Sequence, residues 1–226
     1  MTRLLMLVEG QSEEIFVNQT LGPFLAERGV YVQPPILLWT KRIPSGGGFR
    51  GGVSNWNQIR KNLLPLLSDG DAWVTTLLDF YGLPDDFPGL DAAGAPRERV
   101  HAVQTRFGRE FDHPRFIPFL ALHEFEAWVF CSPDTVAEHF GQPDLAAKVR
   151  KVVDEAGEPE FINHGPTTHP KRRLKGLRAD YKETSDGPGL LAKIGVPAIR
   201  DACSHFASWL ERLEALGAQT PALDSP

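Results

Sequence analysis

Acidic side chains follow three apolar segments of this sequence, at the points where the apolar runs end. Glu9 and Asp79 each come directly after such a run, Glu124 and Glu126 follow a third, and Glu13 lies four residues beyond Glu9. A group of carboxylates suits Mg²⁺ or Mn²⁺ as its metal ion. Zn²⁺ is not indicated, because no cysteines or paired histidines occur here at the spacing that zinc sites use. Such ions beside phosphate serve phosphodiester chemistry. These residues therefore predict a divalent-metal site.

Each acid also has a structural explanation. Glu13 and Glu14 would lie in the first turn of a helix, where the helix dipole favours negative charge without any metal. Asp79 can instead bond to the backbone or pair with a base such as Arg115. An ionised carboxylate at the end of a buried strand nevertheless needs a partner charge or a metal. We favour the metal for Asp79, and both interpretations stay open for the acids at the helix start.

The elements that must position these acids begin with residues 4–8, which are apolar at every position. A continuous apolar run fits a central strand buried on both faces of a parallel sheet. Ser12 is expected to cap a helix that continues to about residue 28. Ligands bind beyond the carboxyl ends of such strands, so we expect Glu9 there, with Glu13 pointing back toward it.

The chain continues as an alternation of apolar runs and amphipathic segments. This alternation implies a mainly parallel sheet wrapped by helices. Pro34 and Pro35 place the second strand at an edge or a bend, whereas residues 115–122 are expected to form a further central strand. The expected strands cover residues 4–8, 31–39, 72–78 and 115–122, and the expected helices cover residues 12–28, 56–67, 96–111, 134–139, 142–157 and 197 onward.

Three regions are expected along the chain. They are an α/β domain over residues 1–132, a helical extension packed on it over 133–217, and a flexible tail over 218–226. The last helix needs a partner surface, because one apolar stripe runs along it at spacings of four and three. That stripe consists of Ile199, Cys203, Phe206, Leu210 and Leu213.

Two segments carry bases suited to contacting phosphate. Residues 41–55 contain five glycines with Lys41, Arg42 and Arg50. This segment lacks the Lys-Ser/Thr ending of a P-loop, so it either closes over a phosphate backbone or is a solvated insertion. The second segment is expected to contact phosphate, with a solvated helical face as the alternative. Its bases are Lys171, Arg172, Arg173, Lys175 and Arg178.

Composition limits the class of protein. The chain has 226 residues, is 42% hydrophobic and carries a formal net charge of -5, which argues against a uniformly basic surface but not against a local basic patch. Cys131 and Cys203 make no disulfide framework. No apolar run reaches the length of a membrane span and no signal segment is apparent, so we expect a cytoplasmic protein without membrane contact.

The sequence resembles the Toprim domain of topoisomerases, primases and overcoming-lysogenization-defect (OLD) nucleases. It resembles still more closely the Toprim-like domain of unknown function 4276. The motifs that carry this resemblance are VEGQSEEIF, LLDFYGLPDDFPG, HEFEAWVF, PKRRLKGL and CSHFASWLERL, which together span nearly the whole chain. The resemblance implies a Toprim-like Rossmannoid parallel sheet flanked by helices, with an α-helical C-terminal extension.

The resemblance also assigns roles to single residues. Glu9 matches the Toprim glutamate, Glu13 the second acid of an E-x-x-x-E metal pair, and Asp79 the first Asp of the D-x-D motif. Glu126, with Glu124 two residues before it, is similar to an acid that follows a later strand in the OLD-type nucleases. The implied metal ligands are therefore these five carboxylates.

One position departs from the family pattern. Tyr81 stands where D-x-D has its second Asp, and a tyrosine does not replace a carboxylate on Mg²⁺. Asp85, Asp86 or the later glutamates Glu124 and Glu126 are candidates to supply the missing carboxylate. Otherwise the site binds one metal ion, or none. Lys171 matches the late lysine of those nucleases.

The function implied is a Mg²⁺- or Mn²⁺-dependent nuclease, acting on DNA rather than RNA, with a role in phage defence. The expected catalytic residues are Glu9, Asp79, Glu126 and Lys171, with Arg172 as an alternative to the lysine. One alternative is a catalytically inactive Toprim-like subunit that binds nucleic acid or a partner ATPase in a defence system. Another is a nucleotidyl- or phosphotransferase that uses the same ions.

Overall fold

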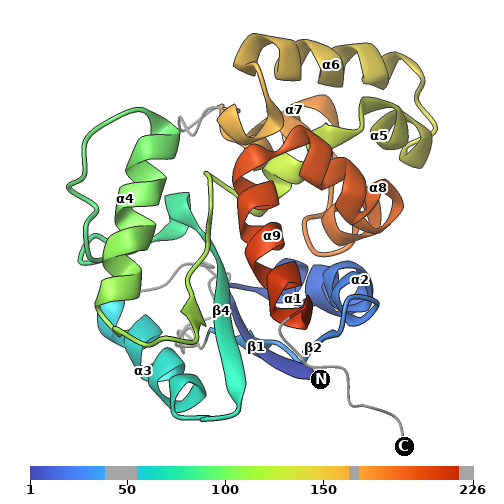
Figure 1. The fold of residues 1–226 in the computed structure, drawn as a ribbon. Coiled ribbons are helices and arrows are strands. Elements are labelled where there is room, and N and C mark those ends of the chain that lie inside the picture. Colours follow the sequence, from blue (N-terminus) through green and yellow to red (C-terminus); the bar gives the residue numbers. More distant parts are fainter. Residues whose placement is uncertain (39–54, 163–167, 219–226) are drawn as a thin grey trace, which may run out of the picture.

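A parallel β-sheet lies at the centre of the computed structural model, which describes residues 1–38, 55–162 and 168–218. Every strand pair is parallel, with β1 and β4 adjacent in the middle, β2 and β3 beside β1, and β5 and β6 beside β4 (Figure 1). The strands are β1 (Thr2–Val8), β2 (Val30–Val32), β3 (Ile36–Leu37), β4 (Ala72–Asp79), β5 (Phe116–Ile117) and β6 (Leu120–Ala121). The expected parallel α/β sheet is confirmed.

Prolines interrupt both edges of the sheet. Pro34 and Pro35 separate β2 from β3, as expected for an edge, because proline cannot donate to the ladder. Pro118 likewise separates β5 from β6. The expectation that residues 115–122 form a central strand was therefore wrong. They lie at the other edge, and their apolar side chains are nevertheless buried.

Helices cover both faces of the sheet (Figure 1). Helices α3 and α4 pack on one face, and α1, α2, α8 and α9 pack on the other. The α-helices are α1 (Gln11–Phe16), α2 (Gly22–Ala26), α3 (Trp56–Leu67), α4 (Pro96–Arg109), α5 (Pro133–His139), α6 (Asp144–Ala156), α7 (Pro170–Leu177), α8 (Asp186–Ala202) and α9 (Ser204–Ala218). A π-helical segment (Val17–Leu21) joins α1 to α2, and 3₁₀ segments cover Phe80–Gly82, Phe125–Cys131 and Pro159–Phe161.

Strand β1 shows why the centre of the sheet is stable. Leu4, Met6 and Val8 face the helices of one side, and Leu5 and Leu7 face those of the other. Successive side chains of a strand point to opposite faces, so an apolar run without polar gaps is required where both faces are covered. The expected double burial of this strand is confirmed.

The helical C-terminal region contains two helical segments that were not expected, α7 and the part of α8 before a break at Gly195 (φ 79°), and it differs from expectation at one further junction. A single helix was expected from residue 197, but α8 ends at an extended Cys203 (φ -129°, ψ 94°) and α9 begins at the next residue. Buried Glu160 accepts hydrogen bonds from the N–H groups of His205 (2.8 Å) and Phe206 (3.1 Å). These bonds satisfy donors that a continuous helix would have used internally, so they stabilise the new helix start.

Helix α9 belongs to the core of the sheet. The indole of Trp209 donates to Thr75 Oγ1 in β4 (3.0 Å) and stacks on Phe119, with ring centroids 4.2 Å apart. Cys131 and Cys203 are free thiols whose Sγ atoms lie 3.3 Å apart. The division at residue 132 stays a prediction. None of the described helices combines the length and apolar character that a membrane crossing requires.

Candidate active site

Glu9 and Asp79 meet at the carboxyl ends of the two central strands. Val8 at the end of β1 pairs with Leu77 in β4, so the residues that follow the strands emerge side by side. Glu9 Oε2 accepts a hydrogen bond from the backbone N–H of Asp79 (3.0 Å). A Cβ atom on Gly82 would lie 2.9 Å from Glu9 Oε1, so this glycine leaves room for the carboxylate.

Glu13 points back toward Glu9 from the first turn of α1. A Cβ atom on Gly10 would lie 3.2 Å from Glu13 Oε2, and the Glu13 side chain is buried. Burial, and after it the charge of Glu13, raise the pKa of Glu9 to about 7. Ser12 does not cap the helix: Gly10 occupies the cap position, and Ser12 Oγ donates to the backbone oxygen of Glu183 (3.2 Å).

Asp79 has a structural bond as well as acidic neighbours. Its Oδ1 atom accepts the backbone N–H of Phe125 (2.9 Å), and no ion pair joins Asp79 to a base among the described residues. Burial raises the pKa of Asp79 well above its usual range, and the charges of Glu9, Glu13 and Glu126 raise it further. The predicted acids therefore lie close enough to repel one another.

Glu124 holds the beginning of α7. Its Oε2 atom accepts hydrogen bonds from Nδ1 of His169 (2.9 Å) and from the backbone N–H of Lys171 (3.1 Å). A carboxylate at a helix N-terminus satisfies free N–H groups and complements the helix dipole. This contact holds α7, and Lys171 with it, beside Glu126.

Lys171 is the cation that pairs with Glu126 among the described residues. Its Nζ atom lies 3.8 Å from Glu126 Oε1 and 3.4 Å from Glu183 Oε2. Burial raises the pKa of Glu126 to about 8, although Lys171 opposes that shift. Burial alone would lower the pKa of Lys171, but the charges of Glu126, Glu183 and Asp79 outweigh it and raise the pKa. The lysine is therefore held in its charged form.

We name Glu9, Glu13, Asp79, Glu124, Glu126 and Lys171 the acidic cluster. Its donors are carboxylate oxygens, the kind that Mg²⁺ and Mn²⁺ prefer. Within residues 1–38, 55–162 and 168–218, however, no three His, Cys, Asp or Glu side chains are arranged to hold one ion. The cluster fits a divalent ion in the chemistry of its donors, and binding would require its side chains to rearrange.

Tyr81 supplies no replacement carboxylate. The residue is 46% exposed, and its ring stacks on that of His169, with centroids 5.9 Å apart and an interplanar angle of 18°. Asp86 is turned toward α3, where it accepts the N–H of Trp56 (2.7 Å), and Asp85 is exposed. The cluster therefore has an aromatic pair beside it where the D-x-D motif has an acid.

A family model described as Domain of unknown function (DUF4276) matches residues 8–214. The chain belongs to this family. No curated protein matches it. Among solved structures, the chain is similar to the C-terminal region of the Burkholderia pseudomallei OLD protein, with 17% identity, a TM-score of 0.44 and coverage of 96% of this chain and 99% of that one. It is also similar to the C-terminal region of the Xanthomonas campestris pv. campestris OLD protein, with 15% identity, a TM-score of 0.39 and coverage of 96% and 97%.

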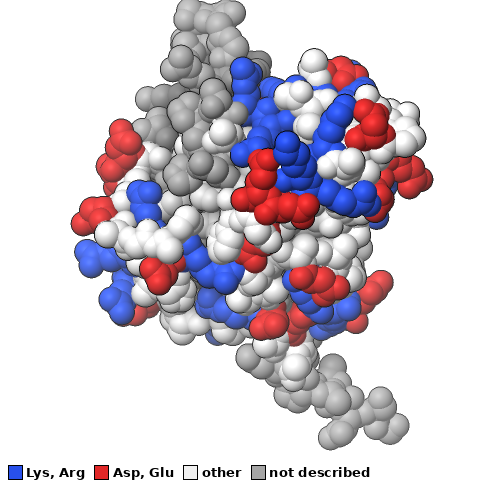
Figure 2. Space-filling model, turned by 90° about the horizontal axis from the view of Figure 1, so that it is seen from above, with Lys and Arg blue, Asp and Glu red and all other residues white. Residues whose placement is uncertain are grey.

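Most bases of α7 in this DUF4276 chain already have partners. Lys175 pairs with Glu183, and Arg173 donates to the backbone oxygen of Thr168 (2.9 Å). Arg172 is exposed and forms no hydrogen bond or ion pair with a described residue. Figure 2 shows basic and acidic side chains intermixed on the face seen from above. Lys41, Arg42 and Arg50 lie outside the described residues.

Two residues of the candidate site were not predicted from the sequence. Glu183 lies beyond α7 and pairs with both Lys171 and Lys175, and His169 binds Glu124. Neither follows an apolar run, which was the pattern used to find the other acids. They reach the cluster only because Glu124 holds α7 against the segment that follows β6.

Proposed function

We propose that this DUF4276 protein is a Mg²⁺- or Mn²⁺-dependent nuclease that acts on DNA, and that the acidic cluster is its active site. The observation that supports the proposal is the meeting of five carboxylates and one lysine beyond the carboxyl ends of β1, β4 and β6. Parallel sheets of α/β proteins bind ligands at this edge. Buried acids with raised pKa values also cluster at functional sites.

Divalent ions would relieve the repulsion that the cluster contains. Glu9 and Asp79 would hold a first ion, and Glu13 and Glu126 would complete a second position. When bound, Mg²⁺ or Mn²⁺ polarises a phosphate group and lowers the pKa of a bound water. The Glu124 carboxylate is already bound to α7, so its part is to position Lys171.

Two bases of α7, Lys171 and Arg172, would contact phosphate groups of the substrate, and Glu126 would act through the metal. Lys171 is charged and lies beside Glu126, so it would donate to a phosphate oxygen as negative charge develops there. Glu126 would help to hold the second ion, and that ion would lower the pKa of the attacking water. Arg172, exposed beside Lys171, would contact the neighbouring phosphate.

Thermal melting and DNA cleavage by wild type and Asp79→Asn test this proposal. Removing the Asp79 charge relieves repulsion in EDTA, so the variant should melt at the same temperature as wild type or above it. Asn keeps an oxygen that can accept the Phe125 N–H bond. Millimolar Mn²⁺ should raise the melting temperature of wild type alone, and only wild type should cleave DNA.

The matched control is Asp85→Asn, which removes an exposed acid six positions later. This variant should keep both the Mn²⁺ shift and cleavage. A wild type that shows neither a shift nor cleavage would refute the nuclease proposal.

A second candidate is an inactive module that binds nucleic acid or a partner ATPase in a defence system. Two observations favour it: Tyr81 in place of a second Asp, and Lys171 already neutralising part of the cluster. This module would bind DNA or the ATPase equally well in EDTA and in Mn²⁺. Metal-dependent cleavage that Asp79→Asn abolishes would exclude it.

A further inference from the structure

The two cysteines of the chain lie side by side, although 72 positions separate them in the sequence. Their Sγ atoms are 3.3 Å apart, and both thiols are free. Cys131 is the last residue of the 3₁₀ segment Phe125–Cys131, and Cys203 is the extended residue between α8 and α9. The sequence contains no other cysteine, so each thiol has one possible partner within the chain.

A buried carboxylate holds together the two elements that carry these thiols. Glu160 accepts the N–H groups of His205 and Phe206 at the start of α9. It also accepts the indole N–H of Trp128 in the 3₁₀ segment (3.5 Å). Trp128 packs against Phe206 as well, with ring centroids 4.8 Å apart. The contact between the thiols is therefore part of the core packing.

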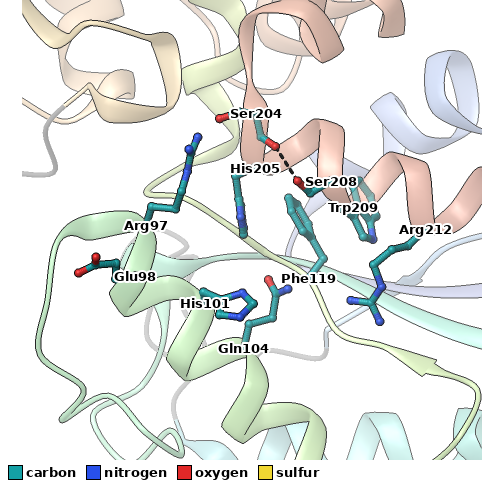
Figure 3. Close-up of a pocket in the computed structure, with 10 residues that line it drawn as sticks. All are labelled: Arg97, Glu98, His101, Gln104, Phe119, Ser204, His205, Ser208, Trp209 and Arg212. Atoms are coloured by element: carbon teal, nitrogen blue, oxygen red, sulfur yellow. Dashed lines mark hydrogen bonds between the residues drawn. The ribbon is translucent and has the colours of Figure 1, made fainter.

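The backbone at Cys203 is hydrogen-bonded on both sides. Its N–H donates to the oxygen of Ile199 (2.9 Å), and its oxygen accepts the N–H of Ala207 (2.8 Å). Figure 3 shows the start of α9, where the hydroxyl of Ser208 donates to the backbone oxygen of Ser204, the residue after Cys203 (3.0 Å). These bonds fix the position from which the Cys203 side chain extends toward Cys131.

Only a small movement separates this contact from a covalent bond. A disulfide has an S–S distance of about 2.05 Å, so the two sulfur atoms have to approach by about 1.2 Å. Small rotations of both side chains supply that movement, and each cysteine lies at the end of a helical segment, so no helix has to bend. Reactants held in place react far faster than separate molecules do.

The two thiols differ in their access to solvent. Cys131 is partly exposed, whereas Cys203 is completely buried. Burial, and after it the contact with Cys131, raise the pKa of the Cys203 thiol well above its usual value. Oxidants react with exposed thiols that can form the thiolate. An oxidant therefore meets Cys131 first, and Cys203 is the resolving thiol beside it.

We propose that Cys131 and Cys203 are a reversible oxidation site, at which a peroxide converts the two thiols to an intramolecular disulfide. The Cys131 sulfur attacks hydrogen peroxide: an S–O bond forms, the O–O bond breaks, and the leaving hydroxide takes the thiol proton as water. The Cys203 sulfur then attacks the sulfenic acid: the S–S bond forms, the S–O bond breaks, and a second water leaves with the Cys203 proton. Two electrons pass from the sulfur atoms to one peroxide.

The disulfide would close a loop that contains α5, α6, α7 and α8. A cross-link removes conformations from the unfolded chain, and it removes more of them when the closed loop is long. Oxidation is therefore expected to stabilise the helical region that carries Lys171. The oxidation needs no metal, and neither cysteine belongs to the acidic cluster, so this inference is independent of the nuclease proposal.

Treatment of the full chain with hydrogen peroxide in EDTA tests the inference. Wild type should lose both thiols that titrate in denaturant, and its mass should fall by two hydrogen atoms without the joining of two chains on a non-reducing gel. Its melting temperature should rise by about 5–10 °C. Dithiothreitol should reverse all of these changes.

Cys203→Ala is the matched control, because it keeps the partly exposed thiol and removes the resolving one. Its Cys131 should form a sulfenic acid that dimedone labels, and oxidation should not raise its melting temperature. Cys131→Ser should keep its buried thiol under the same treatment.

The inference is overturned if peroxide-treated wild type retains both thiols, or if Cys131 passes to sulfinic acid without a disulfide. Oxidation of Cys131→Ser at the wild-type rate would overturn the order of the two steps. A disulfide that joins two chains, or that leaves the melting temperature unchanged, would contradict the inference equally.

Discussion

Lys171 Nζ lies 3.8 Å from Glu126 Oε1, while the backbone N–H of Lys171 donates to Glu124 (3.1 Å). One residue thus contacts both acids that follow β6, through its side chain and its main chain. The main-chain bond fixes where the helix begins, and the side chain then neutralises part of the buried charge. Lys171 is therefore the internal counter-ion of the cluster in the absence of metal.

Replacing Lys171 with methionine should destabilise the metal-free protein. The free energy of unfolding in EDTA at about pH 8 should fall by roughly 1–3 kcal/mol. Removing one partner of a fully buried ion pair costs about 3–5 kcal/mol. The loss should be smaller here because the lysine side chain is 31% exposed. Urea unfolding measures the change. Arg172→Met is the control, because Arg172, next to Lys171, is exposed and has no partner among the described residues. The free energy of unfolding of this variant should stay within about 0.5 kcal/mol of the wild-type value. Equal losses in the two variants would contradict the counter-ion role.

Stability in EDTA should fall as pH rises from about 5 to about 8.5. Burial raises the pKa of Glu9 to about 7, of Glu126 to about 8 and of Glu160 to about 7. Between the ordinary value of 4.5 and these values the folded chain binds more protons than the unfolded chain, so rising pH favours unfolding. Each of these groups lowers the free energy of unfolding by up to about 1.4 kcal/mol for every pH unit in that range.

Urea unfolding at several pH values checks this dependence. Glu160→Gln is an informative control, because it should remove only the share of Glu160 and leave that of the acidic cluster. Stability that is constant or rises over this range would show that the cluster does not gain protons on folding.

DNA binding should depend on the bases of α7 unequally. Each lost phosphate contact lowers the slope of log K against log salt by about 0.9 on duplex DNA. Arg172→Ala should give that full change, because Arg172 has no described protein partner, and Lys175→Ala should give less, because Lys175 is bound to Glu183. Fluorescence anisotropy over a range of salt concentrations measures the slopes. The idea fails if Arg172→Ala leaves the slope unchanged.

Local patterns in the sequence were sufficient to predict that Glu9 and Asp79 meet at the centre of the candidate site. An apolar run buried on both faces needs no partner information to be recognised, and Glu9 and Asp79 follow such runs directly. Parallel pairing of β1 with β4 then brings the two acids together without further assumptions. The placement of Glu13 follows from helix geometry alone.

Other features depend on contacts between distant segments. Residues 115–122 are apolar throughout, and the sequence does not reveal that their partners include side chains such as Gln104 instead of another strand. The break at Cys203 is hidden because Ile199 and Leu213 fit one helical stripe, and only Glu160, more than forty positions earlier, marks the new start. Glu183 and His169 reach the cluster for the same reason.

The bond from Trp209 to Thr75 joins residues 134 positions apart, and α9 with Phe119 completes one apolar face of the sheet. During translation that face stays open after β1 and β4 have been made, because Trp209 in the helix that covers it is made 134 residues after Thr75. Contacts of such sequence separation form late, and the nascent chain meanwhile exposes surface on which other chains can aggregate. Production of this protein should therefore depend on chaperones that hold the nascent sheet until α9 arrives.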